Sequence, residues 1–364
     1  MNAKNGYTNT KDPVQKVLFV TRKYPPSVGG MQKYSHDFYV SMKKIIDVDL
    51  VANKKNKLLL FWIRATIFIL IKSKNYSIIH FGDAVLAPLA IFSKIVARAK
   101  VTLTVHALDI TYRSSLYQAI IPWCVARCDK VICVSNYTID ECVKRGVPRN
   151  KCVFIPNGII FQKHVTFNKK ETFEKLGINV NGKKVLLSVG RLIKRKGNEW
   201  FVNEVMPLLS SKFVYLIVGE GSEKEKIQST VEKHGLANRV FLLGRQSKKM
   251  VHSLYKNSDL FIMPNIEVKG DAEGFGIVLI EAASFGLPSV ASDIEGIKDS
   301  VIEGETGWLV KEREKECFLK KISRDNQNLE IGESFKKFEW KKISKQYHQL
   351  FIDLNVDGHN NLQS

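Results

Sequence analysis

The segment EGFGIVLIE places two carboxylates, Glu273 and Glu281, on either side of a glycine-rich turn and an apolar run. The turn Gly274-Phe275-Gly276 predicts a helix that begins near Gly276 and carries Ile277 in its first turn. Free amide groups at a helix start favour an anion, and Glu281 would lie about a turn further along. Carboxylates accept hydrogen bonds from sugar hydroxyls, and backbone amides hold phosphate. The segment therefore indicates a ligand that carries both groups, such as a nucleotide-sugar.

A basic loop, GRLIKRKG, occupies residues 190–197 directly after an apolar run typical of a strand. Arg191 at the strand end and Lys196 five residues later can neutralise a diphosphate, with Arg195 in the same run. Taken alone, the loop is better explained as a solvated basic turn. Because the same chain also carries the Glu273 segment, the loop is better interpreted as a diphosphate site.

The first half of the chain offers a glycine pair and a histidine at the ends of two expected strands. Gly29 and Gly30 would let backbone approach a ligand at a helix start. His106 could bond a sugar hydroxyl or move a proton, with Asp109 orienting nearby groups. The alternative for His106 is a hydrogen-bonded residue that closes a loop, and the residue pattern leaves both open.

No metal-ligand pattern stands out. Asp47-Val48-Asp49 matches a D-x-D motif, but its place at the start of a short strand is better explained by a strand edge. The turn Gly219-Glu220-Gly221-Ser222 is a common strand-to-helix connection. We therefore expect no metal and no other cofactor.

Strand-like apolar runs alternate with helical patterns along the whole chain, which predicts parallel sheets covered by helices. The expected strands lie near residues 16–21, 48–52, 77–81, 101–105, 130–134, 152–155, 185–189, 215–218, 240–243, 260–263, 289–291 and 307–310. The expected helices of the first half lie near 31–43, 58–72, 84–99, 115–126 and 138–145. Every motif above follows a strand, and ligands of parallel sheets bind at that end.

The alternation pauses at residues 161–170, so the chain is expected to form two doubly wound α/β domains with a cleft between them. The first would span 1–165 and the second 170–335. A helix near 338–355, with Phe338, Trp340 and Tyr347 at helical spacing, would close the second domain or pack back on the first.

The formal net charge of +20 attracts anionic partners. RNA-module and zinc-finger patterns are missing from the sequence, so nucleic acid is not expected, and an anionic membrane surface is the better partner. Leu58 to Ile71 is too short to span a bilayer and suits a buried or interfacial helix. Six scattered cysteines and a polar N-terminus lead us to expect a cytoplasmic protein, peripheral on the inner face of the cytoplasmic membrane.

With these residues in view, the chain resembles the retaining glycosyltransferases built on two facing Rossmann-like domains, the GT-B architecture, of the group 1, family 4 type. The E-x7-E segment is the most specific part of the resemblance. Supporting stretches are GRLIKRKG, VGEG at 218–221, PNG at 156–158 and EGETGWLV at 303–310. Met263-Pro264-Asn265, followed by a polar insert before Asp271, resembles the branch of mannosyltransferases that act on lipid-linked acceptors.

The resemblance implies a role for each matching residue. Arg191 and Lys196 would contact the donor diphosphate, and Glu273 and Glu281 would bind hydroxyls of the sugar and the ribose. His106 would lie over the sugar, as a further catalytic residue. The remaining donor-binding residues would be Gly29, Gly30, Arg195, Val240, Phe241, Leu242, Arg245, Gly274, Phe275, Gly276 and Ile277. The family's H-G-x-D/E is here His106-Ala107-Leu108-Asp109, and Ile159-Ile160 replaces the Val-Asp of N-G-V-D.

The implied reaction is a metal-independent transfer of a hexose, mannose being favoured, from a GDP- or UDP-sugar to a lipid-linked or surface-polysaccharide acceptor. Such an activity belongs to lipopolysaccharide or capsule biosynthesis. Glucosyl, galactosyl or N-acetylglucosaminyl transfer from a UDP donor is the alternative within this fold. Three further classes are less favoured. An epimerase needs groups for ring chemistry that the sequence does not show, and a transferase that uses a phosphate acceptor needs a pocket for that phosphate. A non-catalytic module that binds nucleotide-sugars or polyanions would not need both glutamates, Arg191 and Lys196.

Overall fold

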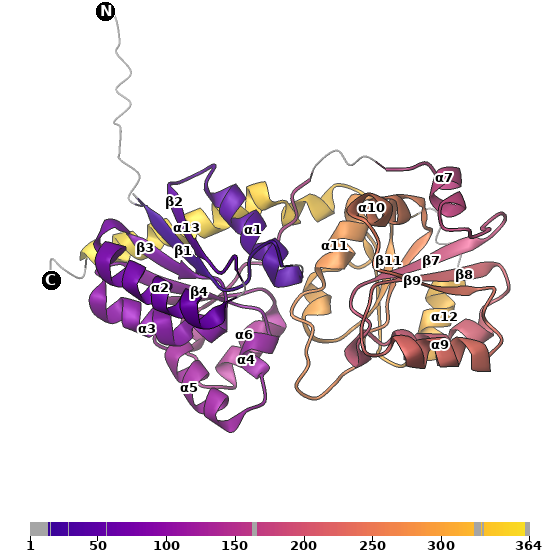
Figure 1. Ribbon diagram of the computed structural model, residues 1–364, viewed down its shortest axis with the longest axis horizontal. Helices are drawn as coiled ribbons and strands as arrows, with labels where there is room; N and C mark the ends of the chain where they lie inside the picture. Colours follow the sequence, from indigo (N-terminus) through magenta and orange to yellow (C-terminus); the bar gives the residue numbers. More distant parts are fainter. Residues whose placement is uncertain are drawn as a thin grey trace, which may run out of the picture.

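The computed structural model describes residues 14, 16–27, 29–55, 57–161, 166–323, 329 and 331–360, without the side chains of 357–360. Two α/β halves lie side by side, each built on one parallel sheet (Figure 1). The fold class expected from the sequence is therefore confirmed. The expected domain boundary at 165 falls outside the described residues.

The first sheet has the strand order β2-β1-β3-β4-β5-β6, with all neighbours parallel. Its strands are β1 (Val17–Thr21), β2 (Val48–Ala52), β3 (Ile78–Phe81), β4 (Lys100–Val105), β5 (Lys130–Cys133) and β6 (Cys152–Phe154). The chain order reverses between β1 and β3. Ligands of open parallel sheets bind at the carboxyl edge beside such a reversal.

The second sheet has the order β12-β11-β10-β7-β8-β9 and is also parallel. Its strands are β7 (Lys184–Val189), β8 (Phe213–Val218), β9 (Val240–Gly244), β10 (Leu260–Met263), β11 (Ser289–Ser292) and β12 (Gly307–Val310). Here the chain order reverses between β7 and β10. All the strands expected from the sequence form, and the central strands of both sheets are apolar runs that are buried on both faces.

Helices cover both faces of the first sheet. One face carries α2 (Leu58–Lys72), α3 (Ala87–Val96), α4 (Leu108–Thr111), α5 (Ser115–Val125) and α6 (Asn136–Val143). The other carries α1 (Gly30–Met42) and the last helix, α13 (Trp340–Asn360). In Figure 1, α13 lies along the first half although it follows the second in sequence. Buried Tyr347 shares a 2.8 Å hydrogen bond with Tyr34 of α1.

The second sheet is covered in the same way. One face carries α7 (Lys169–Glu174), α10 (Lys248–Asn257) and α11 (Ile277–Ser284). The other carries α8 (Asn198–Glu204), α9 (Lys224–Lys233) and α12 (Lys315–Ser323).

A small apolar cluster joins the halves. Val134 and Ile159 of the first half pack with Phe275 and Ile280 of the second, and Phe338 completes the cluster. The backbone N–H and the side-chain amide of Asn136 each donate to Asp299, both at 2.7 Å. The carboxyl edges of the two sheets are therefore held close to each other.

Candidate active site

The loops that follow β7 and β10 meet because these strands are neighbours at the reversal of the second sheet. The basic loop 190–197 follows β7, and the segment that ends in Glu273 follows β10. Gly197 makes their contact possible: its φ is +65°, and a side chain there would lie 1.8 Å from the carbonyl of Pro264. The topology thus places sequence motifs that are almost eighty residues apart on one edge.

Glu273 is the centre of this edge. Its carboxylate accepts hydrogen bonds from Arg195 Nη1 and Lys196 Nζ, and Asn265 Nδ2 lies 3.3 Å away. Burial raises the pKa of Glu273, but the attraction of Lys196 and Arg195 outweighs burial and lowers the pKa to about 2. The carboxylate is therefore ionised at neutral pH and able to accept hydrogen bonds from a sugar.

The loop has four cations, and the three expected to bind the donor differ in their surroundings. Arg195 is buried and pairs with both Glu273 and Asp271, the latter at 2.9 Å. Lys196 is largely buried, and burial lowers its pKa. Arg191 is exposed, and its positive charge also acts to lower the pKa of Lys196. Of these three, Arg191 is thus the cation that is open to an incoming diphosphate.

Glu281 lies in α11, which begins at Ile277 as the sequence indicated, after Gly276 with a φ of +78°. Its carboxylate accepts hydrogen bonds from Tyr255 of α10 at 3.2 Å and from Lys33 of α1 at 2.5 Å. Lys33 belongs to the first half of the molecule. Each oxygen of the carboxylate that was expected to bind ribose therefore already accepts one hydrogen bond from the protein.

His106 follows β4 in the first half, opposite the Glu273 segment. Its Nε2 lies 3.0 Å from the Gly82 carbonyl oxygen, and its backbone N–H donates to Asp109. A carbonyl can only accept, so Nε2 carries the proton. Burial lowers the pKa of His106 to about 4, against the opposing pull of Asp83. His106 is therefore neutral at pH 7. Asp109 also accepts from the backbone of Ala84 and closes this loop.

Ala107 forms a strained turn beside His106. Its φ and ψ are 73° and −71°, and Leu108 N–H donates across it to the His106 carbonyl at 3.1 Å. This γ-turn is rare for residues with a side chain. The same carbonyl packs against Gly274, where a side chain would come within 2.4 Å of it. His106 and the Glu273 segment are thus in direct backbone contact across the cleft.

Gly29 and Gly30 stand where the sequence placed them, at the start of α1 and beside the reversal of the first sheet. A side chain at Gly30 would meet no atom within 4 Å. The space over Gly30 is therefore open to a ligand.

The residues expected to flank the base lie at different positions along β9 and just after it. Val240 and Phe241 lie in its first part, paired with β8 and away from the carboxyl edge. Leu242 lies nearer that edge, and exposed Arg245 lies just beyond it. Asp47 and Asp49 bind Lys16 at the opposite, amino edge of the first sheet, which agrees with a strand-edge role. In the described part of the chain, no group of His, Cys, Asp and Glu residues is arranged to hold a metal.

Three residues of this edge were given no role from the sequence. Asp271 binds Arg195, and Glu295 accepts from the backbone N–H of Glu273. Asn265 is buried, and its Oδ1 has no hydrogen-bond partner among the described residues. Only the polar insert before Glu273 could have signalled Asn265 and Asp271. Glu295 follows another strand, and nothing in its spacing singles it out.

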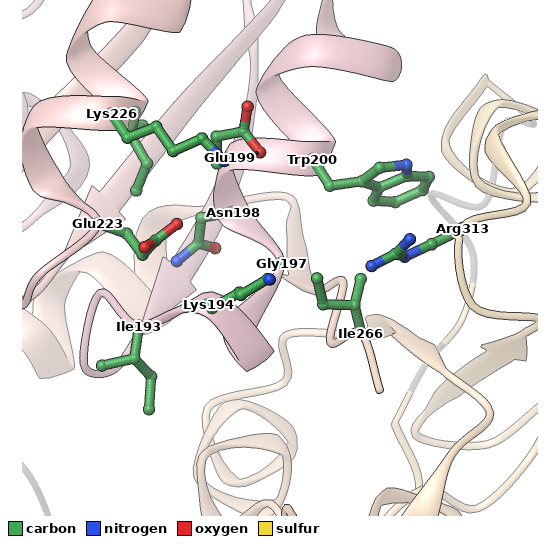
Figure 2. Close-up of a pocket in the computed structure, with 11 residues that line it drawn as sticks. Ile193, Lys194, Gly197, Asn198, Glu199, Trp200, Glu223, Lys226, Ile266 and Arg313 are labelled. Atoms are coloured by element: carbon green, nitrogen blue, oxygen red, sulfur yellow. Dashed lines mark ion pairs between the residues drawn. The ribbon is translucent and has the colours of Figure 1, made fainter. Parts of the chain in front are cut away.

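The hollow in Figure 2 lies on the flank of the basic loop rather than at this edge. Its volume is about 180 Å³, and Lys194, Trp200, Glu223 and Arg313 are among its lining residues. Arg191, Lys196 and Glu273 do not line it. Known ligand pockets have volumes of about 300–1,000 Å³, so this hollow is too small for a nucleotide-sugar. The carboxyl edges remain the candidate site.

Two family models match the two halves in turn. The model "Glycosyltransferase Family 4" matches residues 16–163, and "Glycosyl transferases group 1" matches residues 168–337. The chain belongs to the group 1, family 4 glycosyltransferases. The matched ranges place Glu273, Arg191 and Lys196 of this glycosyltransferase in the group 1 half and His106 in the family 4 half.

This glycosyltransferase is similar to several curated proteins. It is 26% identical to the putative colanic acid biosynthesis glycosyltransferase WcaL of Escherichia coli over 255 residues, which are 69% of this chain and 61% of WcaL. It is 28% identical to the E. coli UDP-Gal:α-D-GlcNAc-diphosphoundecaprenol α-1,3-galactosyltransferase over 277 residues, 71% of this chain and 68% of that protein. The alignment thus spans roughly three-fifths to two-thirds of these relatives.

Solved structures show the same fold. HepE of Anabaena, solved with UDP and glucose, superposes with a TM-score of 0.72 at 18% identity, covering 92% of this glycosyltransferase and 99% of HepE. Sucrose-phosphate synthase of Thermosynechococcus elongatus gives a TM-score of 0.76 at 19% identity, covering 94% and 100%. The GT-B fold expected from the resemblance is therefore confirmed.

Proposed function

We propose that this glycosyltransferase moves a hexosyl group from a UDP-sugar to a lipid-linked or surface-polysaccharide acceptor, with retention and without a metal ion. The related E. coli galactosyltransferase is named for UDP-Gal, and HepE was solved with UDP and glucose. These relatives favour a UDP donor, and glucose or galactose over the mannose that the resemblance favoured. The enzyme is proposed to act at the cytoplasmic face of the membrane.

The observation that carries this proposal is the gathering of Glu273, Arg195 and Lys196 at one sheet reversal, opposite His106. The donor's diphosphate would draw Arg191 and Lys196, and Glu273 would accept hydrogen bonds from the sugar. His106 is neutral and is therefore suited to forming a hydrogen bond with a sugar hydroxyl.

The proposed chemistry needs no side-chain nucleophile. The bond from the sugar's anomeric carbon to the diphosphate oxygen breaks, and the acceptor hydroxyl bonds to the same face of that carbon. The hydroxyl proton passes to an oxygen of the leaving diphosphate. The protein positions both substrates and stabilises the charge that develops on the leaving group.

The test is donor hydrolysis without acceptor, in EDTA, with UDP-glucose, UDP-galactose, UDP-N-acetylglucosamine and GDP-mannose. We expect one UDP-sugar to be hydrolysed fastest. Glu273→Ala and Arg191→Ala should each abolish this turnover, whereas Glu305→Ala and Lys212→Ala, at exposed positions of the same half, should not. Donor hydrolysis that persists in Glu273→Ala would refute the proposed site. If GDP-mannose is hydrolysed fastest, mannose becomes the favoured donor sugar again.

A further inference from the structure

The outer face of α2 is apolar, although α2 already buries an apolar face. Phe61, Ala65 and Ile69 point into the first core. Large aliphatic side chains, each 48–74% exposed, also cover the opposite side of the helix. These residues are Leu58, Leu59, Leu60, Ile63, Ile67, Leu70 and Ile71. A helix that is apolar all round is normally buried in a core or a membrane. Nothing in the described structure covers this outer face.

The apolar surface continues over the neighbouring helices. Helices α2, α3 and α5 pack side by side on one face of the first sheet, as Figure 1 shows. Ile95 of α3 is 79% exposed, and Leu116, Ile120 and Trp123 of α5 are exposed as well. We call the exposed apolar side chains of α2, α3 and α5 the α2–α5 face.

Positive charge predominates around this face. Residues 54–100 contain nine lysines and arginines and one acid, Asp83. Asp83 is fully buried and pairs with Arg22 at 2.8 Å. The guanidinium of Arg127 lies 3.5 Å from the ring centroid of exposed Trp123. Cations around an apolar centre complement a bilayer, whose surface is anionic and whose interior is hydrocarbon.

We infer that the α2–α5 face inserts into the surface of an anionic membrane, with α2 lying in the plane of the bilayer. The fifteen residues of α2 are about 22 Å long, whereas the hydrocarbon core is about 30 Å thick. No helix of the described residues is long and apolar enough to cross a bilayer. A second copy of this chain is a poorer occupant, because a symmetric pairing would bring the same cations together.

The face also reaches the candidate site. Leu108, Tyr112 and Leu116 are exposed and follow His106 directly. Arg113, between them, lies against Gly270 of the second half. An acceptor whose lipid stays in the bilayer would therefore present its sugar at the mouth of the cleft. This last step rests on the proposed function, whereas insertion itself does not.

Flotation of the purified chain with vesicles tests the inference. We expect the chain to float with phosphatidylcholine vesicles that contain phosphatidylglycerol, and less with phosphatidylcholine alone. The variant Leu59→Ser/Ile63→Ser/Ile67→Ser should lose at least tenfold in partitioning. A matched control, Val143→Ser/Leu208→Ser/Val356→Ser, removes exposed apolar side chains elsewhere and should float like the parent. All six positions are exposed, so both variants should fold.

The tryptophan emission of the parent should shift to the blue on anionic vesicles, and the shift should shrink in Trp123→Phe. Salt should weaken the residual vesicle binding of Leu59→Ser/Ile63→Ser/Ile67→Ser more than that of the parent. The variant is held to the vesicle mainly by electrostatic attraction, which salt screens. Failure of the parent to float would overturn the inference, as would equal flotation of the two triple variants. A stable dimer that Leu59→Ser/Ile63→Ser/Ile67→Ser turns into monomers would assign the face to a second copy. Donor hydrolysis in solution, unchanged by the triple variant, separates this result from a failure of the proposed function.

Discussion

At the scale of single residues, Glu273 is ionised because two cations outweigh the effect of its burial. Removal of the carboxylate would leave buried Lys196 without its ion-pair partner and Arg195 with Asp271 alone. The same group is the proposed acceptor of sugar hydrogen bonds. A substitution of Glu273 is therefore expected to change both the free energy of unfolding and the rate of donor hydrolysis. A control variant is needed to tell the two effects apart.

Glu273→Gln is expected to lower the free energy of unfolding by about 3 kcal/mol, because a broken buried ion pair leaves its partners unpaired. Donor hydrolysis should fall by about two orders of magnitude. Urea unfolding and a hydrolysis assay measure the two effects. Asp271→Asn is the control, because Asp271 also binds Arg195 but is half-exposed; a loss as large as that of Glu273→Gln would contradict this account.

His106 makes stability depend on pH. Burial lowers its pKa from 6.5 to about 4, so between these values the unfolded chain binds the proton and the folded chain does not. Stability is therefore full above pH 6.5 and falls as the pH drops towards 4. At pH 5 the loss from His106 is about 2 kcal/mol. Urea unfolding at pH 7 and pH 5 should show a smaller drop for His106→Gln than for the parent; equal drops would exclude His106 as the cause.

At the scale of elements, the turn at Ala107 and the start of α1 position the first half of the site. The γ-turn gives Ala107 a positive φ that a glycine adopts without strain. Ala107→Gly is expected to stabilise the chain by about 1 kcal/mol, the strain relieved exceeding the added freedom of the unfolded chain. Thermal unfolding measures the effect, with hydrolysis retained. A lower melting temperature would show that the turn is not strained.

Gly30→Ala tests the open space at the start of α1. An alanine there meets no atom and favours the helix by up to about 1 kcal/mol, so the melting temperature should stay or rise. Its methyl group would occupy the space proposed for the donor, so the KM for the donor should increase. Gly332→Ala, also in open space, is the control. An unchanged KM would place the donor away from α1.

The elements were predictable from the sequence, whereas several contacts of the site were not. Each strand is a local apolar run, and each motif follows a strand, so local patterns suffice for both. Lys33 and Glu281 are 248 residues apart, and only the docking of the two halves brings them together. The sequence likewise showed that α2 is apolar but not that its outer face is uncovered, because that depends on which helices pack beside it.

At the scale of the whole molecule, a small apolar cluster and several polar contacts join the two halves at the carboxyl edges of their sheets. The Asn136–Asp299 hydrogen bonds and the Lys33–Glu281 pair are polar and partly exposed. Such contacts contribute little to stability individually. They are suited to break and re-form as the two halves open and close around a donor.

Asp299→Ala is expected to loosen the halves without unfolding either. The free energy of unfolding should change by less than about 1 kcal/mol, whereas the radius of gyration in solution scattering should increase and the KM for the donor should rise. Asp293→Ala is the matched control, because Asp293 pairs with Lys298 inside the second half. Equal scattering from the two variants would show that the Asn136 contact does not hold the halves together.

The position of α13 sets an order of events during synthesis. The ribosome makes every strand of the first sheet before it begins the second, yet α13 supplies Trp340, Ile343, Tyr347, Phe351 and Leu354 to the core beneath α1. That core stays incomplete until the last helix has left the ribosome. Every strand of the second sheet, the last of which is β12, has by then emerged. The half that is synthesised first is therefore completed last, and a nascent chain waits with this face of its first sheet covered by α1 alone.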